Sequence, residues 1–311
     1  MKRIVSLLIV LALALAMTLS MASAEEAKSI AFLPPAMISP YYATCISGAE
    51  PVAAELGYEL LVAAPPSESD YAGQIQLVED MLARGVDGII VCAINTDAIV
   101  TAVKKANEAG VPVVMFNVQN ELAEGEVGCY VTYDQRAGGA KVADYVAEVV
   151  GDAEVNAAVI EGLPSEHTTE RMGGFCDQIA AKYPNITFVG SQPGDWEREK
   201  GMNAAANMMQ AMDIDVFFGL CDEMSLGAVQ AVKQAGGDQL VFSFDGNPNA
   251  AEAVKNGDLM CTLSIGGIDT GAQCVYMLDK LIKGEEVEKF YTIETQVINA
   301  DNVDEYLKLF E

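Results

Sequence analysis

Short apolar runs alternate with longer amphipathic segments along almost the whole chain. The longer segments repeat apolar residues at intervals of three and four, as in 71–85, where Ile75, Val78 and Met81 share one face of a predicted helix. The short runs contain few polar residues, which is typical of strands buried on both faces of a parallel sheet. We predict strands at 29–33, 58–64, 88–93, 111–116, 128–133, 156–162, 186–191, 215–220, 239–244, 259–264 and 290–298. The repeated strand–helix order predicts a doubly wound α/β fold.

The predicted strands are too many for one small sheet, and two similar α/β lobes fit the pattern better. The alternation weakens at 128–139, where we expect the chain to pass from one lobe to the other. Pro51 lies inside the first helical segment, so this helix is predicted either to kink or to begin late. In sheets of this kind, ligands bind beyond the carboxyl ends of the strands.

The first 24 residues have the pattern of a secretory signal peptide. Lys2 and Arg3 precede an unbroken apolar segment at 4–17, and Ala22-Ser23-Ala24 forms an A-x-A cleavage site. No cysteine stands at the cleavage point, as a lipoprotein would require. We therefore expect a soluble exported protein, periplasmic or extracellular, that begins near Glu25, with an uncleaved anchor as the alternative.

Composition narrows the partners and the chemistry. The formal net charge is −27, so the protein should repel nucleic acid and anionic lipid, although the charge does not identify a ligand. The seven cysteines are widely spaced and form no CxxC motif, which argues against a zinc site and a small disulfide scaffold. Several lie in apolar runs, such as 89–93 and 259–263, so we expect buried, reduced thiols. One disulfide remains an open alternative.

Aromatic and polar residues follow the predicted strands, where a ligand would bind. Aromatic rings stack on the apolar faces of sugars, while an arginine fork and carboxylates bind hydroxyls. Each residue also has a structural interpretation: the rings as packing residues, Arg171 as a surface helix residue, and Asp245 as a turn or helix cap. The candidates are Tyr41, Tyr42, Asn117, Arg171, Trp196, Cys221, Asp222 and Asp245.

Signatures of catalysis are weak. The GxSxG, HExxH, Walker A and dinucleotide motifs do not occur in the required strand–turn–helix context. His167 is the only histidine; we expect it in a solvated loop, with the rim of a pocket as the alternative. Glu161 and Glu166 could pair for glycoside hydrolysis, but such pairs are expected by chance in so acidic a chain. We predict a protein that is not an enzyme and has no cofactor or metal.

The chain after the signal peptide resembles the periplasmic sugar-binding proteins of ABC transporters, specifically the ribose-binding type of the type I periplasmic binding proteins. The resemblance extends over nearly all of this region. The stretches that carry it are SPYY, GAEPVAAELGYEL, VEDMLARGVDGIIV, TDAIVTAVKKANEAGVPVV, DQRAGGAKVADYV, ERMGGF, SQPGDWEREKGMNAAANMM, CDEMSLGAVQAVKQAG and FSFDGNPNAAEAVKNG, in this order.

This resemblance implies two Rossmann-like lobes with parallel sheets, joined by a three-stranded hinge, with a ligand cleft between them. The chain should cross near Tyr133, near Ile265 and near Thr295. The N-terminal lobe would then comprise 25–133 and 266–294, and the C-terminal lobe 134–265 and 295–311.

The resemblance also implies a set of ligand-binding positions. These are Ser39, Tyr41, Tyr42, Cys92, Asn117, Val118, Arg171, Trp196, Cys221, Phe244, Asp245 and Ile265. The ribose-binding type has asparagines at positions 39, 92 and 221, an Asp–Arg pair at 117–118, and a glutamine at 265. Because an unpaired buried hydroxyl costs about 1–3 kcal/mol, we expect ribose to bind poorly, and a less hydroxylated or different small polar ligand to bind better.

The resemblance implies a solute-binding protein that delivers a small sugar-like molecule to an ABC permease, without nucleic acid and as a monomer. The first alternative is a sensory protein that presents a small polar, non-sugar ligand to a receptor kinase or chemoreceptor. A transcription regulator would need a DNA-binding helix-turn-helix where the signal peptide stands. An enzyme would be distinguished by turnover of its ligand.

Overall fold

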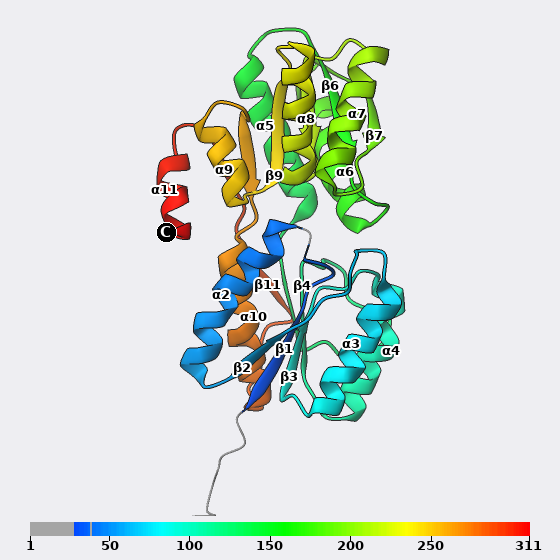
Figure 1. Cartoon of the computed structure of the whole chain (residues 1–311), viewed down its shortest axis with the longest axis vertical. Helices are drawn as coiled ribbons and strands as arrows, with labels where there is room; N and C mark the ends of the chain where they lie inside the picture. Colours follow the sequence, from blue (N-terminus) through cyan, green and yellow to red (C-terminus); the bar gives the residue numbers. More distant parts are fainter. Residues whose placement is uncertain (1–27, 38) are drawn as a thin grey trace, which may run out of the picture.

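The computed structural model describes residues 28–37 and 39–311 and has two α/β lobes (Figure 1). Each lobe contains a six-stranded, mostly parallel sheet with helices on its faces. The predicted fold class is therefore confirmed. The predicted signal peptide lies outside the described residues. In the part of the chain that the structure describes, no helix has the length and apolar character needed to cross a membrane.

The sheet of the N-terminal lobe has the strand order β11-β5-β4-β3-β1-β2, and all its pairings are parallel. Its strands are β1 (Ser29–Leu33), β2 (Glu59–Val62), β3 (Gly88–Val91), β4 (Val113–Phe116), β5 (Cys129–Thr132) and β11 (Phe290–Thr292). Helices α2 (Pro40–Leu56) and α10 (Gly267–Ile282) pack on each other beside one face. Helices α3 (Tyr71–Arg84) and α4 (Thr96–Glu108) lie on the opposite side of the sheet (Figure 1).

The sheet of the C-terminal lobe has the order β12-β10-β9-β8-β6-β7, and only β12 runs antiparallel to its neighbour β10. Its strands are β6 (Val155–Glu161), β7 (Ile186–Pro193), β8 (Val216–Gly219), β9 (Leu240–Asp245), β10 (Cys261–Ser264) and β12 (Gln296–Ile298). Helix α5 (Gln135–Val150) packs on α6 (Glu166–Lys182), and α7 (Arg198–Ala211) packs on α8 (Asp222–Ala235). Helices α9 (Pro248–Lys255) and α11 (Val303–Leu307) pack together, followed by the 3₁₀ helix η1 (Lys308–Phe310).

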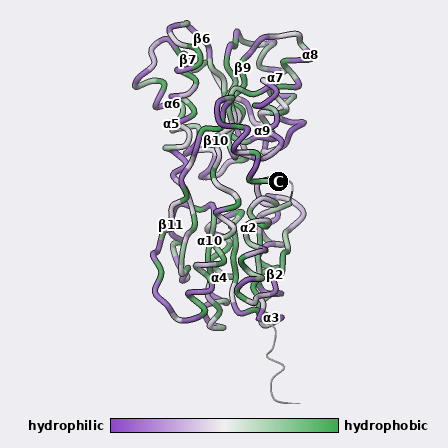
Figure 2. The backbone as a smooth tube through the Cα atoms, turned by 90° about the vertical axis from the view of Figure 1, so that its left-hand side faces the viewer, coloured by the Kyte–Doolittle hydropathy of each residue, from purple (hydrophilic) through white to green (hydrophobic). Residues whose placement is uncertain are grey.

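Three connections join the lobes. They lie between β5 and α5, between β10 and α10, and between β11 and β12. At the second connection Gly266 has φ 61°, a left-handed conformation that glycine adopts at little cost. Figure 2 shows the lobes one above the other, with hydrophobic segments in both. The inner strands of each sheet are almost fully buried, as expected for sheets covered on both faces, whereas the edge strands β2, β7, β11 and β12 are partly exposed.

Two predicted elements differ in the structure. The predicted strand 290–298 is split into β11 and β12, which belong to different sheets. The chain therefore crosses from one lobe to the other within this apolar run. Helix α2 begins at Pro40 and contains Pro51, so the prediction of a late start is wrong. Pro51 removes the donor that would bond the carbonyl of Ser47, and Ser47 is exposed, so water can satisfy that carbonyl.

Candidate functional site

A cavity between the lobes encloses about 720 Å³ of space, part of which is open to solvent. The predicted positions that border it are Ser39, Tyr41, Tyr42, Cys92, Asn117, Arg171, Trp196, Cys221 and Asp245. Val118, Phe244 and Ile265 are buried and do not border it. Both lobes therefore contribute to one cavity, and three of the predicted positions lie behind its wall.

The tyrosine pair lies at the start of helix α2, directly after the first strand and a short loop. Ser39 caps this helix, because its Oγ accepts a hydrogen bond from the backbone N–H of Tyr41 at 3.3 Å. The rings of Tyr41 and Tyr42 meet edge to face, with centroids 5.4 Å apart. Burial raises the pKa of both phenols, so they remain neutral. The cap thus sets two neutral aromatic side chains at the cavity.

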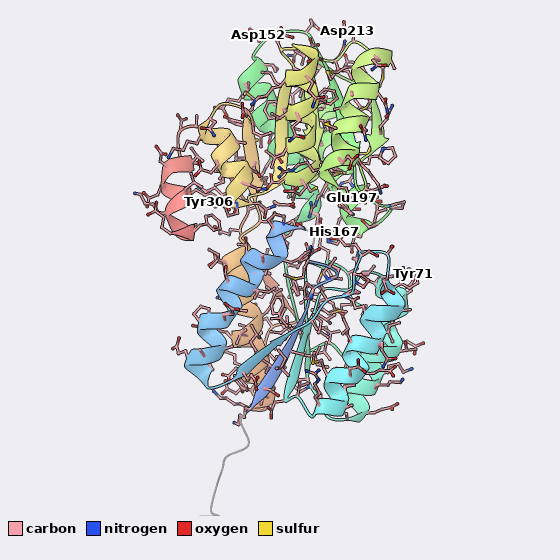
Figure 3. All side chains as sticks on the ribbon, viewed as in Figure 1. Tyr71, Asp152, His167, Glu197, Asp213 and Tyr306 are labelled. Atoms are coloured by element: carbon pink, nitrogen blue, oxygen red, sulfur yellow. The ribbon has the colours of Figure 1, made fainter. Side chains whose placement is uncertain are left out.

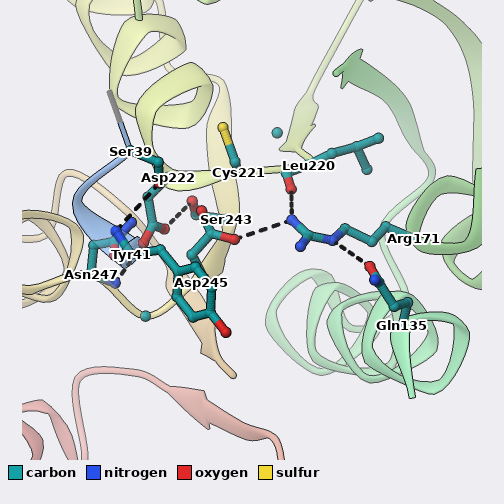
Figure 4. A network of polar contacts seen from close by, with 12 residues as sticks. Ser39, Tyr41, Gln135, Arg171, Leu220, Cys221, Asp222, Ser243, Asp245 and Asn247 are labelled. Atoms are coloured by element: carbon teal, nitrogen blue, oxygen red, sulfur yellow. Dashed lines mark hydrogen bonds and ion pairs between the residues drawn. The ribbon is translucent and has the colours of Figure 1, made fainter. Parts of the chain in front are cut away.

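Arg171 lies at the centre of a polar network in the C-terminal lobe (Figure 4). Its Nη1 donates to Asp245 Oδ1 at 3.1 Å and to the Leu220 carbonyl at 2.6 Å. Its Nε donates to Gln135 Oε1 at 3.0 Å, and its Nη2 donates to the Tyr133 hydroxyl at 2.6 Å. The side chain is 4% exposed, so the interpretation of Arg171 as a surface helix residue is wrong.

This network occupies most of the donors of Arg171. Four of the five guanidinium N–H groups bind protein acceptors, by the hydrogen bonds just described. The guanidinium also lies over the Phe244 ring, with its Cζ 4.2 Å from the ring centroid. Phe244 therefore acts as the platform beneath Arg171, which explains why a predicted ligand position does not border the cavity. Arg171 holds the site in place and offers a ligand few free donors.

Asp245 ends strand β9 in an unusual backbone conformation, with φ 122°. The neighbouring loop is fixed by Asp222, whose Oδ1 accepts from Ser243 Oγ at 2.5 Å and Thr262 Oγ1 at 2.7 Å. Asp222 Oδ2 accepts from the Asn247 N–H at 2.7 Å. Burial raises the pKa of Asp245 to about 6, while Arg171 opposes the rise. These contacts hold the strained residue at the cavity.

Trp196 reaches the cavity from the loop between β7 and α7. Its backbone has φ 66°, and its indole lies so close to Gly162 that a Cβ there would come within 1.9 Å of the ring. A glycine at position 162 is thus required for the ring to lie where it does. Arg171 Cζ lies 5.7 Å from the indole centroid, so the ring is beside the polar network.

The N-terminal lobe supplies Asn117 and Cys92 at the ends of strands β4 and β3. Asn117 adopts φ 57° and donates its backbone N–H to the Val131 carbonyl at 3.0 Å. Gln74 fixes the loop after Cys92, since its Nε2 donates to the Cys92 carbonyl at 2.8 Å. Among the described residues, Asn117 Oδ1 is buried without a hydrogen-bond partner. This oxygen is an available acceptor beside the cavity.

Two titratable residues at the cavity were not predicted as ligand positions. Glu68 lies in the loop before α3, and burial, followed by the charge of Asp245, raises its pKa to about 7. His167 lies in the first turn of α6 and borders the cavity, so its prediction as a solvated loop residue is wrong. Burial and the charge of Arg171 lower its pKa to about 3, which keeps the imidazole neutral. The rule that ligands bind at strand ends would have admitted Glu68, but nothing in the sequence shows that its loop reaches the cleft.

The lobes meet beside the cavity, where His167 lies between them (Figure 3). Asn120 of the N-terminal lobe donates its Nδ2 to Glu166 Oε1 of the C-terminal lobe. The Glu161 carboxylate instead accepts from Ser191 Oγ, and neither glutamate borders the cavity. Within 28–37 and 39–311, no cluster of His, Cys, Asp and Glu suited to a metal ion is found.

Comparisons with known proteins agree with this architecture. The model of the periplasmic binding protein domain matches residues 30–286. The ribose import binding protein of Salmonella typhimurium is 33% identical over 282 residues, which cover 89% of this chain and 92% of that protein. The D-allose-binding periplasmic protein of Escherichia coli is 31% identical over 258 residues, which cover 80% of this chain and 83% of that protein.

Solved structures give the same result. A periplasmic solute-binding protein of Actinobacillus succinogenes with bound D-allose has a TM-score of 0.85 and 31% identity, and the match covers 90% of this chain and all of that chain. A solute-binding protein of Agrobacterium vitis with bound D-fucose has a TM-score of 0.82 and 30% identity, covering 90% and 98% of the two chains. With two similar lobes, a cavity between them and a family model that matches most of its length, this chain belongs to the periplasmic binding protein family.

Proposed function

We propose that this protein is an extracytoplasmic solute-binding protein that captures a small sugar-like molecule and delivers it to an ABC importer. The observation that carries the proposal is the cavity between the lobes, with aromatic rings from one lobe facing the Arg171–Asp245 pair of the other. A ligand that contacts both lobes stabilises their closed arrangement. An importer can then distinguish the closed, loaded form from the open form.

The chemistry of the cavity suits a molecule with both a flat apolar face and polar edges. Tyr41, Tyr42 and Trp196 offer aromatic surface, and the Asp245 carboxylate can accept hydrogen bonds from hydroxyls. The relatives are named for ribose and allose, and similar structures hold allose and fucose. These names support a sugar-like ligand and give no support to the sensory alternative.

The proposal extends to the roles of individual residues, the lobe boundaries, and the location and oligomeric state of the protein. The cavity-bordering positions contact the ligand, while Phe244 supports Arg171 from beneath and Ile265 packs behind the wall. The lobes comprise 25–133 with 266–294 and 134–265 with 295–311, and the protein acts as a periplasmic or extracellular monomer. A binding role without turnover is supported by the relatives, which are named as binding proteins.

The decisive experiment identifies the molecule that the protein binds. Protein purified from its native host is denatured, and the released small molecules are analysed by mass spectrometry. A panel of sugars, deoxy sugars and polyols is then tested by thermal shift and calorimetry. We expect a sugar-like compound to bind saturably, and NMR to show that the bound compound is not converted. Ribose should give a smaller thermal shift than less hydroxylated compounds. Absence of any sugar-like ligand, or turnover of the bound compound, would refute the proposal.

A further inference from the structure

Glu68 projects from a short turn into the space between the lobes. The turn is held by its own hydrogen bonds: the Asp70 N–H donates to the Ser67 carbonyl at 3.1 Å, and the Ser67 and Ser69 hydroxyls lie 3.0 Å apart. Asp70 then caps helix α3 by accepting from the Gly73 N–H at 2.9 Å. These hydrogen bonds order the backbone on both sides of Glu68, and the residue borders the cavity between the lobes.

Glu68 has no counter-ion within the described chain. Its carboxylate forms no ion pair there and no hydrogen bond, although it borders the cavity that contains Arg171. It also borders an adjoining outer cavity, which Lys200 lines. Lys200 is already paired, at 3.0 Å with Asp195 and at 2.8 Å with Glu197. The arginine and the lysine that line these two cavities are thus already paired with other carboxylates.

The charged groups that line the cavity carry an excess of negative charge, whereas its polar atoms without a partner in the described chain include both the Asn117 Oδ1 acceptor and the Tyr41 hydroxyl. Arg171 uses four of its five N–H groups on protein oxygens, and its charge is balanced by Asp245. Asn117 Oδ1 is buried without a partner among the described residues. Glu68 adds a second carboxylate against the single guanidinium. Beside a neutral ligand Glu68 is either protonated or an unbalanced charge in a partly buried site, whereas a cation stabilises its ionised form.

We infer that the ligand of this cleft carries a positively charged nitrogen, as in an amino sugar or an imino sugar, and that Glu68 pairs with it. This inference rests on the proposed function, since it assigns a class of ligand to the same cavity. The aromatic rings of Tyr42 and Trp196 can also face a cation favourably. The net charge of −27 favours the approach of a cation. Glu68 is then the residue that selects an amine over the matching neutral sugar.

The titration of Glu68 provides a second readout. Its pKa of about 7 would fall when a cation binds, so the affinity for an amine should rise between pH 5 and 7.5. Asp245, Arg171, Tyr42 and Cys92 face Glu68 from the packed elements, and Lys200, Asp195 and Glu197 line the outer cavity. Asp245 has a pKa of about 6 and titrates in the same interval. The pH profile is therefore interpreted as the difference between wild type and Glu68→Gln.

The test compares matched pairs of amine and neutral compounds by calorimetry. The pairs are D-glucosamine with D-glucose, D-galactosamine with D-galactose, and 1,4-dideoxy-1,4-imino-D-ribitol with 1,4-anhydro-D-ribitol. We expect at least one amine to bind about tenfold or more tightly than its neutral partner, and Glu68→Gln to remove this preference. Glu55→Gln is the matched control, because Glu55 is an exposed glutamate of the same lobe. It should bind as wild type does.

The binding results distinguish a failure of the amine inference from a failure of the proposed function. If the neutral compound binds at least as tightly as its amine partner in every pair that binds, or if Glu68→Gln keeps the amine preference, the inference is wrong while the proposed function stands. If no compound of either series binds, the molecule released on denaturation decides: a sugar-like molecule without a basic nitrogen contradicts the inference alone, one with a basic nitrogen supports it, and the absence of any sugar-like molecule contradicts both. A cooperative urea unfolding curve for Glu68→Gln shows that the variant is folded, so that a loss of binding reflects the lost charge.

Discussion

Replacement of Arg171 by leucine should strongly destabilise the C-terminal lobe. The guanidinium is buried and binds Asp245, Gln135 and the Leu220 carbonyl, so its removal leaves a buried carboxylate and further acceptors without partners. Breaking a buried ion pair in this way costs about 3–5 kcal/mol. Protonation limits the loss, because the pKa of Asp245, already about 6, should rise further without the neighbouring positive charge.

A double-mutant cycle separates the pair from its surroundings. Asp245→Asn alone leaves the positive charge of Arg171 buried without its counter-ion, whereas the double variant removes both charges. We expect the double variant to be more stable than the sum of the single effects by about 1–3 kcal/mol. Urea denaturation followed by circular dichroism gives the free energy of unfolding of each variant. As a control, the exposed Lys104–Glu124 pair can be removed in the same way.

Two results would contradict the predicted role of the Arg171 network. If Arg171→Leu unfolds at the same urea concentration as wild type, the network does not stabilise the lobe. If the single effects simply add, the ion pair contributes no coupling and the contacts with Gln135 and Leu220 dominate instead. The control pair should leave the unfolding midpoint nearly unchanged, because exposed ion pairs contribute little.

Three further measurements test the cavity and the thiols. Trp196, the only tryptophan, borders the cavity, so a bound ligand should change its fluorescence, and an unchanged emission would contradict this placement. Trp196→Ala should lose about 1–3 kcal/mol of binding free energy, and Trp196→Phe should lose much less because a ring remains. Six of the seven unpaired cysteines are buried, so Ellman titration should detect mainly the Cys176 thiol in the native protein and all seven thiols in denaturant. Fewer than seven reactive thiols in denaturant would indicate disulfides. The folded-state pKa of Glu68 is raised to about 7, so the stability that its protonated carboxyl contributes is lost as pH rises from 4.5 through 7. Over this interval the free energy of unfolding of wild type should fall relative to that of Glu68→Gln by up to about 3 kcal/mol, and a stability difference that does not change with pH would refute the prediction.

The strand and helix pattern could be predicted from the sequence because it follows from local periodicity. Buried strands such as β3 and β8 are apolar throughout, and helices such as α4 carry apolar residues at helical spacing. The positions of the two sheets relative to each other could not be derived in this way. The run 290–298 looked like one strand because periodicity does not reveal which neighbour a strand pairs with.

The rule that ligands bind beyond strand ends predicted Asn117 and Tyr41 at the cavity, and both border it. Cys92, at the end of β3, also borders the cavity but was expected there only from the resemblance. Contact of these residues with a ligand stays a prediction. Glu68 was not predicted at the cavity, and His167 only as an alternative, because a single sequence does not show which loops of the two lobes face each other. Asn120 and Glu166, for example, form a hydrogen bond between the lobes although they lie 46 residues apart, and such a pair gives no local signal.

Resemblance alone also overstates what Arg171 offers a ligand. An arginine at this position suggests a free fork of donors, and the sequence contains no sign that Gln135, Leu220 and Asp245 use most of it. Once these bonds are counted, Arg171 has few free donors and its charge is paired with Asp245, so Glu68 is left as a charged group without a counter-ion among the described residues that line the cavity. Ser39, Cys92 and Cys221 each carry one hydroxyl or thiol, where asparagine would add both an amide donor and an amide acceptor. These positions therefore reduce the neutral hydrogen bonds that the cavity can offer, and the unpaired Glu68 carboxyl favours a ligand with a positively charged group.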